Sequence, residues 1–176
     1  MSILKVARMG HPVLRAQARP LEKSEIRGAY IQKLIDDMLD TMAEYHGVGL
    51  AAPQVHEGVR LFVAALDDGE EDEDGEPLAL INPEITVVGA DVVEDWEGCL
   101  SIPDVRGRVP RAREIKVRAY DRKGNRIELG AHDFPARVIQ HETDHLDGVL
   151  FFDRMKSLGS MTFLDEYSRY WRKTDD

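Results

Sequence analysis

Apolar side chains recur at every fourth position between residues 24 and 46, a spacing that keeps them on one face of an α-helix. The pattern predicts a helix over 24–46, and Ser24 is a residue type that caps helix N-termini. Gly47 follows directly and suits the left-handed position that ends many helices. We interpret the recurring positions as core residues; they are Ile26, Tyr30, Leu34, Met38 and Met42.

The middle of the chain consists of short apolar or alternating runs, which are typical of β-strands. Pro83 and Gly89 separate some of these runs, and 121–125 has the composition of a hairpin turn. Residues 1–23 lack either periodicity and are expected to form an extended arm with turns. The expected strands are 61–66, 78–82, 85–88, 92–93, 115–120 and 126–129.

Helical spacing returns near the C-terminus. Pro135 suits the first turn of a helix, where its missing N–H has no partner to lose, and Gly148 suits the end. Within this helix and just after it, Ile139, Leu146 and Leu150 are expected to enter the core. A last helix is predicted over 158–171. Strands and helices in this order predict an α+β fold with mixed or antiparallel sheets.

Length and composition fit one globular domain over 1–176, with 43% hydrophobic and 32% charged residues. A domain of this size is large enough to be a catalytic domain. The net charge of −10 argues against direct nucleic-acid specificity, which needs a basic surface. We expect no membrane segment, because no apolar run is long enough to cross a bilayer. The N-terminus has no apolar signal-peptide core, so the expected location is the cytoplasm.

Eight of the eleven residues in the segment 67–77 are Asp or Glu. Blocks of like charge repel one another and remain solvated, so we interpret this segment as a mobile loop between strands. It lacks the ordered ligand spacing of an EF-hand, which argues against a calcium site.

The chain Gln140-His141-Glu142-Thr143-Asp144-His145 contains the pattern His-Glu-x-x-His. On a helix, His141 and His145 share one face and can bind one metal ion, while Glu142 can reach a water molecule beside it. The alternative is a surface helix that happens to carry two histidines. A catalytic metal of this type takes a third protein ligand, and this ligand decides the class of enzyme.

Two positions are candidates for the third ligand. A carboxylate at Asp165 or Glu166, downstream of His145, would resemble zinc metalloproteases, although both residues also fit a polar helix face. Cys99, the only cysteine, lies upstream after Gly98, and its thiolate would bind a divalent metal strongly. A lone cysteine is otherwise a small buried apolar residue. The chemistry favours Cys99, but the spacing leaves both candidates open.

Three separated segments together resemble the three motifs of peptide deformylases. They are Gly47-Val48-Gly49-Leu50-Ala51-Ala52-Pro53-Gln54, Glu97-Gly98-Cys99-Leu100-Ser101 and Gln140-His141-Glu142-Thr143-Asp144-His145. The segments occur in the family's order, and the similarity extends from Gly10 to Asp153. The acidic segment 67–77 and the tail after Asp153 depart from the family pattern.

The resemblance implies a fold built around the helix that carries both histidines, with Cys99, His141 and His145 as metal ligands. It implies one divalent metal ion, with ferrous iron as the native metal and zinc, nickel or cobalt able to occupy the same site. Glu142 would be the general acid and base. The implied reaction removes the formyl group from N-formyl-methionyl nascent chains and releases formate.

The resemblance also implies roles in substrate binding. The side-chain amide of Gln54 and the backbone N–H of Leu100 would bind the formyl oxygen, and Val48 and Gly49 would pair with the substrate as a strand does. We expect the methionine pocket near Val48, Leu50, Val138 and His141. Arg106 and Arg111 have two interpretations, as ligands of a substrate carboxylate or as partners of Glu97.

Family members act on chains that emerge from the ribosome, so transient ribosome association is an implied partner contact. The balanced charge after Asp153 gives no docking signal of its own. Two other classes stay open: a metalloprotease that uses Asp165 or Glu166, and a non-enzymatic binding protein that has kept the fold.

Overall fold

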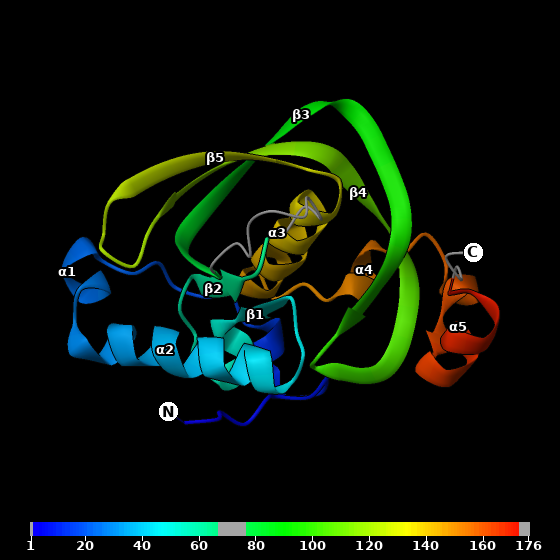
Figure 1. Ribbon diagram of the computed structural model, residues 1–176, viewed down its shortest axis with the longest axis horizontal. Coiled ribbons are helices and arrows are strands. Elements are labelled where there is room, and N and C mark those ends of the chain that lie inside the picture. Colours follow the sequence, from blue (N-terminus) through cyan, green and yellow to red (C-terminus); the bar gives the residue numbers. More distant parts are fainter. Residues whose placement is uncertain (1, 67–76, 173–176) are drawn as a thin grey trace.

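An antiparallel β-sheet curves around one central helix in the computed structural model, which describes residues 2–66 and 77–172 (Figure 1). The sheet has the order β1-β2-β3-β4-β5, and a short strand β6 pairs with β4. The strands are β1 Gly49–Ala51, β2 Leu61–Ala64, β3 Leu78–Cys99, β4 Ile102–Tyr120, β5 Arg126–His132 and β6 Thr162–Phe163. The helices are α1 Lys23–Ile26, α2 Ala29–Glu44, α3 Asp133–Leu146, α4 Phe151–Arg154 and α5 Leu164–Tyr170, with 3₁₀ turns η1 Pro12–Arg15, η2 Ala52–Val55 and η3 Leu158–Ser160.

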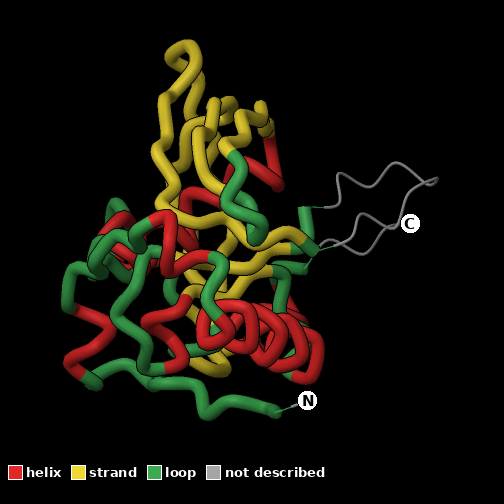
Figure 2. The backbone as a smooth tube through the Cα atoms, turned by 90° about the vertical axis from the view of Figure 1, so that its left-hand side faces the viewer, coloured by secondary structure: helices red, strands yellow, loops and turns green. Residues whose placement is uncertain are grey.

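This architecture confirms the predicted α+β class and the central position of the helix that carries both histidines. The face of α3 that holds Ile139 and Leu146 is fully buried against the sheet, as the helical spacing predicts. In the view turned by 90°, strands fill the upper part of the molecule and the N-terminal loop runs along the opposite side (Figure 2). No helix among the described residues has the length and apolarity needed to span a membrane.

The three strand segments predicted between residues 78 and 93 are one continuous strand, β3, so that prediction is wrong in its number of strands. Shifts in register between Ile81 and Glu84 and between Val88 and Val92 interrupt the pairing of β3 with β4. A bulge is a place where a sheet tolerates proline, which lacks an N–H, and Pro83 lies in the first of these shifts. Breaks in the apolar pattern therefore mark bulges that bend the strand around α3.

The prediction of a single helix over 24–46 is also wrong. Arg27 and Gly28 divide this segment into α1 and α2. A Cβ on Gly28 would lie 3.0 Å from the Glu25 carbonyl oxygen, so the junction leaves little room for a side chain. The helix ends with His46, not Gly47, in the left-handed conformation. Tyr30, expected in the core, is 64% exposed and donates a hydrogen bond to Glu57.

The C-terminal segment 158–171, predicted as one helix, consists of η3, β6 and the shorter helix α5. In Figure 1, α5 lies beside the β3–β4 hairpin rather than within the core. The α-helix begins only at Leu164, because Thr162 and Phe163 pair with β4 instead. The hairpin turn predicted at 121–125 is present, with Gly124 at a φ of +77°. Most of the predicted acidic loop 67–77 lies outside the described residues.

Candidate metal centre

Cys99, His141 and His145 come together inside the protein, although Cys99 is far from the histidines in sequence. The ligand-type atoms of the three residues all lie within 4.8 Å of one another, and Cys99 Sγ is 3.2 Å from His145 Nε2. Ligand atoms around a tetrahedral metal with bonds of about 2.0–2.3 Å lie roughly 3.3–3.8 Å apart. One thiolate and two imidazoles in this arrangement fit a divalent transition metal.

These side chains come from two elements, β3 and α3. Cys99 is the last residue of β3, where the register of the β3–β4 hairpin shifts between Glu97 and Cys99. His141 and His145 lie one turn apart on the buried face of α3, with ring centroids 5.0 Å apart. Asp165 and Glu166, the alternative ligands, are on α5, and Glu166 pairs with Arg169 at 3.3 Å. In the described part of the chain, neither belongs to a group of three residues able to hold a metal.

The surroundings of Cys99 favour its ionised form. Burial opposes ionisation, but the charge of His145 and hydrogen bonds from both histidines hold the pKa of the Cys99 thiol well below its usual value. Burial likewise opposes protonation of His141, yet Cys99 and Glu97 hold the pKa of its imidazole well above the usual value. A thiolate is the form of cysteine that binds metal, whereas the imidazole of His141 must lose its extra proton before it can act as a ligand.

Glu97 orients one of the two imidazoles. Its Oε2 lies 2.8 Å from His141 Nδ1, which leaves Nε2 of that ring for the centre of the site. His145 differs, because its buried Nδ1 has no hydrogen-bond partner among the described residues. The carboxylate of Glu97 is itself buried, with 5% of the residue exposed.

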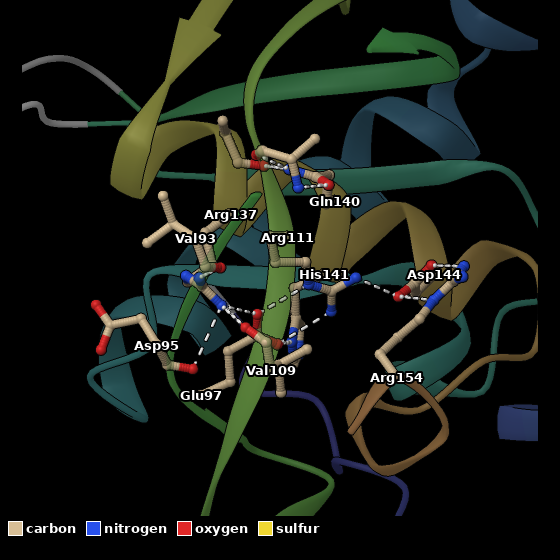
Figure 3. A network of polar contacts seen from close by, with 12 residues as sticks. Val93, Asp95, Glu97, Val109, Arg111, Arg137, Gln140, His141, Asp144 and Arg154 are labelled. Atoms are coloured by element: carbon tan, nitrogen blue, oxygen red, sulfur yellow. Dashed lines mark hydrogen bonds and ion pairs between the residues drawn. The ribbon is translucent and has the colours of Figure 1, made fainter. Parts of the chain in front are cut away.

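A network of buried charges surrounds Glu97 (Figure 3). Arg111 donates two hydrogen bonds to Glu97, from Nε at 2.9 Å and from Nη2 at 3.0 Å. Arg137 donates a third from Nη1 at 2.8 Å. Arg111 also pairs with Asp144 at 2.6 Å, and Asp144 accepts further hydrogen bonds from Arg154. Burial opposes ionisation of Glu97, but His141 and Arg111 hold the pKa of its carboxyl well below the usual value.

Arg137 ties α3 to the hairpin that carries Cys99. Its guanidinium donates to the backbone carbonyls of Val93 at 2.7 Å and Val109 at 2.8 Å, one on β3 and the other on β4. The same group reaches Glu97, so one side chain connects the helix of the histidines with the strand of the cysteine. Arg137 was not among the predicted site residues, although it lies one turn before His141 in an otherwise apolar stretch. A charged residue on the buried face of a helix is the signal that could have identified it.

Glu142 is buried beside the three ligand-type residues. Burial raises the pKa of its carboxyl to about 6, and its Oε2 has no hydrogen-bond partner in the described part of the structure. A Cβ at Gly49 would collide with Oε1 of Glu142 and lie 2.7 Å from its Cδ. A side chain at residue 49 would therefore displace the carboxylate of Glu142, and glycine lets β1 approach it closely.

The orientation of Gln54 follows from its hydrogen bonds. Its Oε1 accepts from the N–H of Ala51 at 2.8 Å, so Nε2 points the other way. Nε2 donates to Ser101 Oγ at 3.2 Å and to Cys99 Sγ at 3.4 Å. The buried amide thus presents its N–H groups toward the side of the site where Cys99 lies.

A cavity of about 570 Å³ opens beside these residues. Its size lies within the range of small-molecule sites, which measure about 300–1,000 Å³. It includes the predicted substrate-binding residues Val48 and Gly49, and Leu100 lines it as well. Of the methionine-pocket candidates, Val138 and His141 line it too, whereas Leu50 is fully buried and does not.

Arg106 and Arg111, for which the sequence allowed two interpretations, have different positions in the structure. Arg111 is buried and paired with Glu97, so its side chain is part of the network behind the site. Arg106 lines the cavity, and its guanidinium occupies the space that a side chain at Gly98 would need. Of these two arginines, Arg106 is therefore the one that is placed to meet a ligand.

Comparison with known proteins gives one consistent result. The sequence model of the polypeptide deformylase family matches residues 3–161. Peptide deformylase 2 of Nostoc sp. is 45% identical, and the alignment covers 94% of this chain and 93% of the relative. Peptide deformylase of Heliobacterium modesticaldum is 43% identical, with 89% and 97% covered.

Solved structures agree with the sequence comparisons. A class I type b peptide deformylase from Acinetobacter baumannii, bound to Met-Ala-Ser, superimposes with a TM-score of 0.81 at 38% identity. This likeness covers 88% of this chain and all of the other. Peptide deformylase from Thermotoga maritima superimposes with a TM-score of 0.80 at 38% identity, covering 89% of this chain and all of the other.

Proposed function

The chain belongs to the polypeptide deformylase family of enzymes, and from this premise we propose that it removes the formyl group from the N-terminal formyl-methionine of newly made polypeptides. The reaction is an amide hydrolysis: water adds to the formyl carbon, the C–N bond breaks, and formate and a free amine leave. The observation that carries the proposal is the convergence of Cys99, His141, His145 and Glu142 beside one cavity.

We assign the metal site to Cys99, His141 and His145. Their donor atoms fit one divalent ion, and such an ion, when bound, would lower the pKa of a water molecule and polarise a carbonyl group. Ferrous iron is the proposed native metal, with zinc, nickel or cobalt as substitutes. The Cys99 thiolate beside iron would be open to oxidation, so we expect activity loss in air that a zinc- or nickel-loaded sample largely escapes. Equal sensitivity of all metal forms would contradict the choice of iron.

Glu142 is the proposed general acid and base. Its carboxylate accepts the proton that the attacking water loses and then delivers it to the amine nitrogen of the departing peptide. The buried, unpartnered Oε2 and the raised pKa of about 6 support this role, because a base with a pKa near neutrality can both take and release a proton.

The formyl oxygen gains negative charge as water adds. We propose that Gln54 Nε2 and the backbone N–H of Leu100 donate hydrogen bonds to it, and loss of one such donor would cost about 3 kcal/mol of transition-state stabilisation. The fixed amide of Gln54 supports its part in this, because Ala51 already occupies Oε1. Replacing Gln54 by Ala should therefore lower kcat by about 100-fold.

The peptide substrate is proposed to lie along β1 at Val48 and Gly49. β1 is at one end of the strand order and pairs with β2 alone among the described strands, so one edge is free to accept another strand. The first residue's side chain would enter the apolar part of the cavity near Val138. Ribosome contact and a cytoplasmic location stay predictions; co-sedimentation with ribosomes would test the first and localisation of a fluorescent fusion in cells the second.

Formate release from formyl-Met-Ala, together with metal analysis of anaerobically purified protein, tests the proposal. Glu142→Ala should keep its metal and lose formate release, whereas Cys99→Ala should lose both. A metalloprotease with a carboxylate ligand would instead keep its metal in Cys99→Ala. A binding protein without activity would show no formate release even in the wild type.

A further inference from the structure

The C-terminal segment forms part of the cavity wall. Strand β6 adds to β4 at Val105 and Arg106, and α5 begins immediately afterwards at Leu164. Leu164 lines the same cavity as His141 and Glu142. The match to the family model ends at residue 161, so Leu164 lies beyond the matched stretch.

Aromatic contacts fix α5 in this position. The indole ring of Trp96, on β3, lies 5.1 Å from the ring of Tyr167 and 6.0 Å from that of Trp171, measured between centroids. Just before β6, Ser160 Oγ accepts a hydrogen bond from the N–H of Arg108 at 3.1 Å. The segment is therefore held at both ends, and the position of Leu164 does not depend on a flexible tail.

The part of the cavity wall formed by Leu164 and Trp96 is less polar than the end of the cavity beside Cys99, which we call the reactive end. The reactive end presents the polar groups of Gln54, Glu142 and Cys99, whereas Leu164 and Trp96 present apolar, partly exposed side chains. Partly exposed apolar surface beside a catalytic site becomes favourable when a ligand covers it. The cavity is also larger than a formyl group and one side chain require, since sites of this volume accept drug-sized ligands.

We propose that Leu164, with Trp96, contacts the side chain of the second or third residue of the substrate and makes the enzyme favour an apolar residue there. The inference rests on the proposed function, because it assumes that a formylated peptide occupies the cavity. The reactive end must hold the formyl group, and the first side chain enters beside Val138. The part of the cavity wall that α5 contributes is then available to contact the second and third residues of the substrate.

Three formylated peptides that differ only after methionine test the inference: formyl-Met-Ala-Ser, formyl-Met-Leu-Ser and formyl-Met-Ala-Leu. The wild type should favour at least one leucine peptide over formyl-Met-Ala-Ser by roughly fivefold in kcat/KM, a value appropriate to a partly buried apolar side chain. Leu164→Ala should reduce that preference to roughly one. The change should appear in KM with kcat kept, because the contact is made equally in the ground and transition states.

Two variants separate contact with the substrate from a purely structural role. Phe163→Ala is the matched control, because Phe163 lies next to Leu164, is 67% exposed and does not line the cavity. It should keep the wild-type preference. Leu164→Met, which conserves apolar volume, should also keep it.

The outcomes separate the proposed function from the role of Leu164. A wild type that releases no formate from any of the peptides would overturn the proposed function. A wild type that releases formate without preferring either leucine peptide would overturn only the role of Leu164. The same conclusion would follow if the preference survived in Leu164→Ala or fell equally in Phe163→Ala.

Discussion

Replacing Glu97 by Gln tests whether the buried charge network holds the site together. The Glu97 carboxylate receives four hydrogen bonds, two from Arg111, one from Arg137 and one from the His141 ring. Glutamine keeps the shape but has one acceptor oxygen, and its NH₂ group must face N–H donors. The substitution also removes the only negative charge that contacts Arg137 among the described residues.

The structure sets the expected size of the effect. Removing one partner of a buried ion pair costs about 3–5 kcal/mol, because the other charge remains buried and uncompensated. Arg111 keeps its 2.6 Å contact with Asp144, so we expect a loss near the lower end, about 3 kcal/mol of unfolding free energy. For a chain of this length each kcal/mol lowers Tm by about 2–4 °C, which predicts a decrease of roughly 6–12 °C.

Equilibrium unfolding in urea and a metal titration measure the two consequences separately. Because His141 is a proposed metal ligand, loss of the carboxylate that orients its ring should weaken metal affinity by about 10- to 100-fold. Glu128→Gln is the matched control, since Glu128 pairs with Arg118 at 3.1 Å on the surface, and this pair should contribute less than about 1 kcal/mol. If Glu97→Gln were no more destabilising than this control, or bound metal as tightly as the wild type, the role given to the network would be refuted.

Three further changes test other parts of the structure. Gly49→Ala places a Cβ against the Glu142 carboxylate, so formate release should fall by about 100-fold while bound metal, measured by elemental analysis, stays near the wild-type level. Gly148→Ala should lower the unfolding free energy by about 1–3 kcal/mol, because Gly148 has a φ of +71° and a Cβ there would lie 2.6 Å from the Arg15 carbonyl oxygen; an unchanged urea midpoint would contradict this. Backbone and side-chain N–H groups hold the pKa of Asp121 below its usual value despite burial, so its contribution to stability is present above the unfolded pKa of about 3.9 and disappears as pH falls through the lower folded pKa. The stability difference between wild type and Asp121→Asn, followed by thermal unfolding, should therefore shrink on acidification from pH 6 toward pH 3.

The sequence was sufficient for the parts of the site that depend on local spacing. A separation of four residues puts His141 and His145 on one helix face, and Glu142 between them follows from the same geometry. The choice of Cys99 over Asp165 or Glu166 came from resemblance to the family, because no local rule brings the end of β3 beside α3. The structure brings Cys99 to both histidines and leaves the two carboxylates on α5.

The errors share a physical cause, which is that tertiary contacts override local periodicity. Residue 30 has the helical spacing of a core position, but Tyr30 turns outward to Glu57. The segment 158–171 has helical periodicity throughout, yet Thr162 and Phe163 gain more from pairing with β4 than from continuing a helix. Local patterns identify elements well only where no neighbouring strand edge competes for the same backbone groups.

Glu97, Arg111 and Asp144 look in the sequence like ordinary surface charges, and the fold shows that they are buried together with Arg137. Charged side chains are rarely buried unless they are paired, and here each has a partner of opposite sign. Glu97 and Arg111 come from the two strands of the hairpin that carries the cysteine, whereas Arg137 and Asp144 come from the helix that carries the histidines. Apolar contacts between a strand and a helix tolerate small shifts, but ion pairs with two or more fixed hydrogen bonds do not. The network therefore supplies what hydrophobic burial alone lacks, a defined position of Cys99 relative to the two imidazoles.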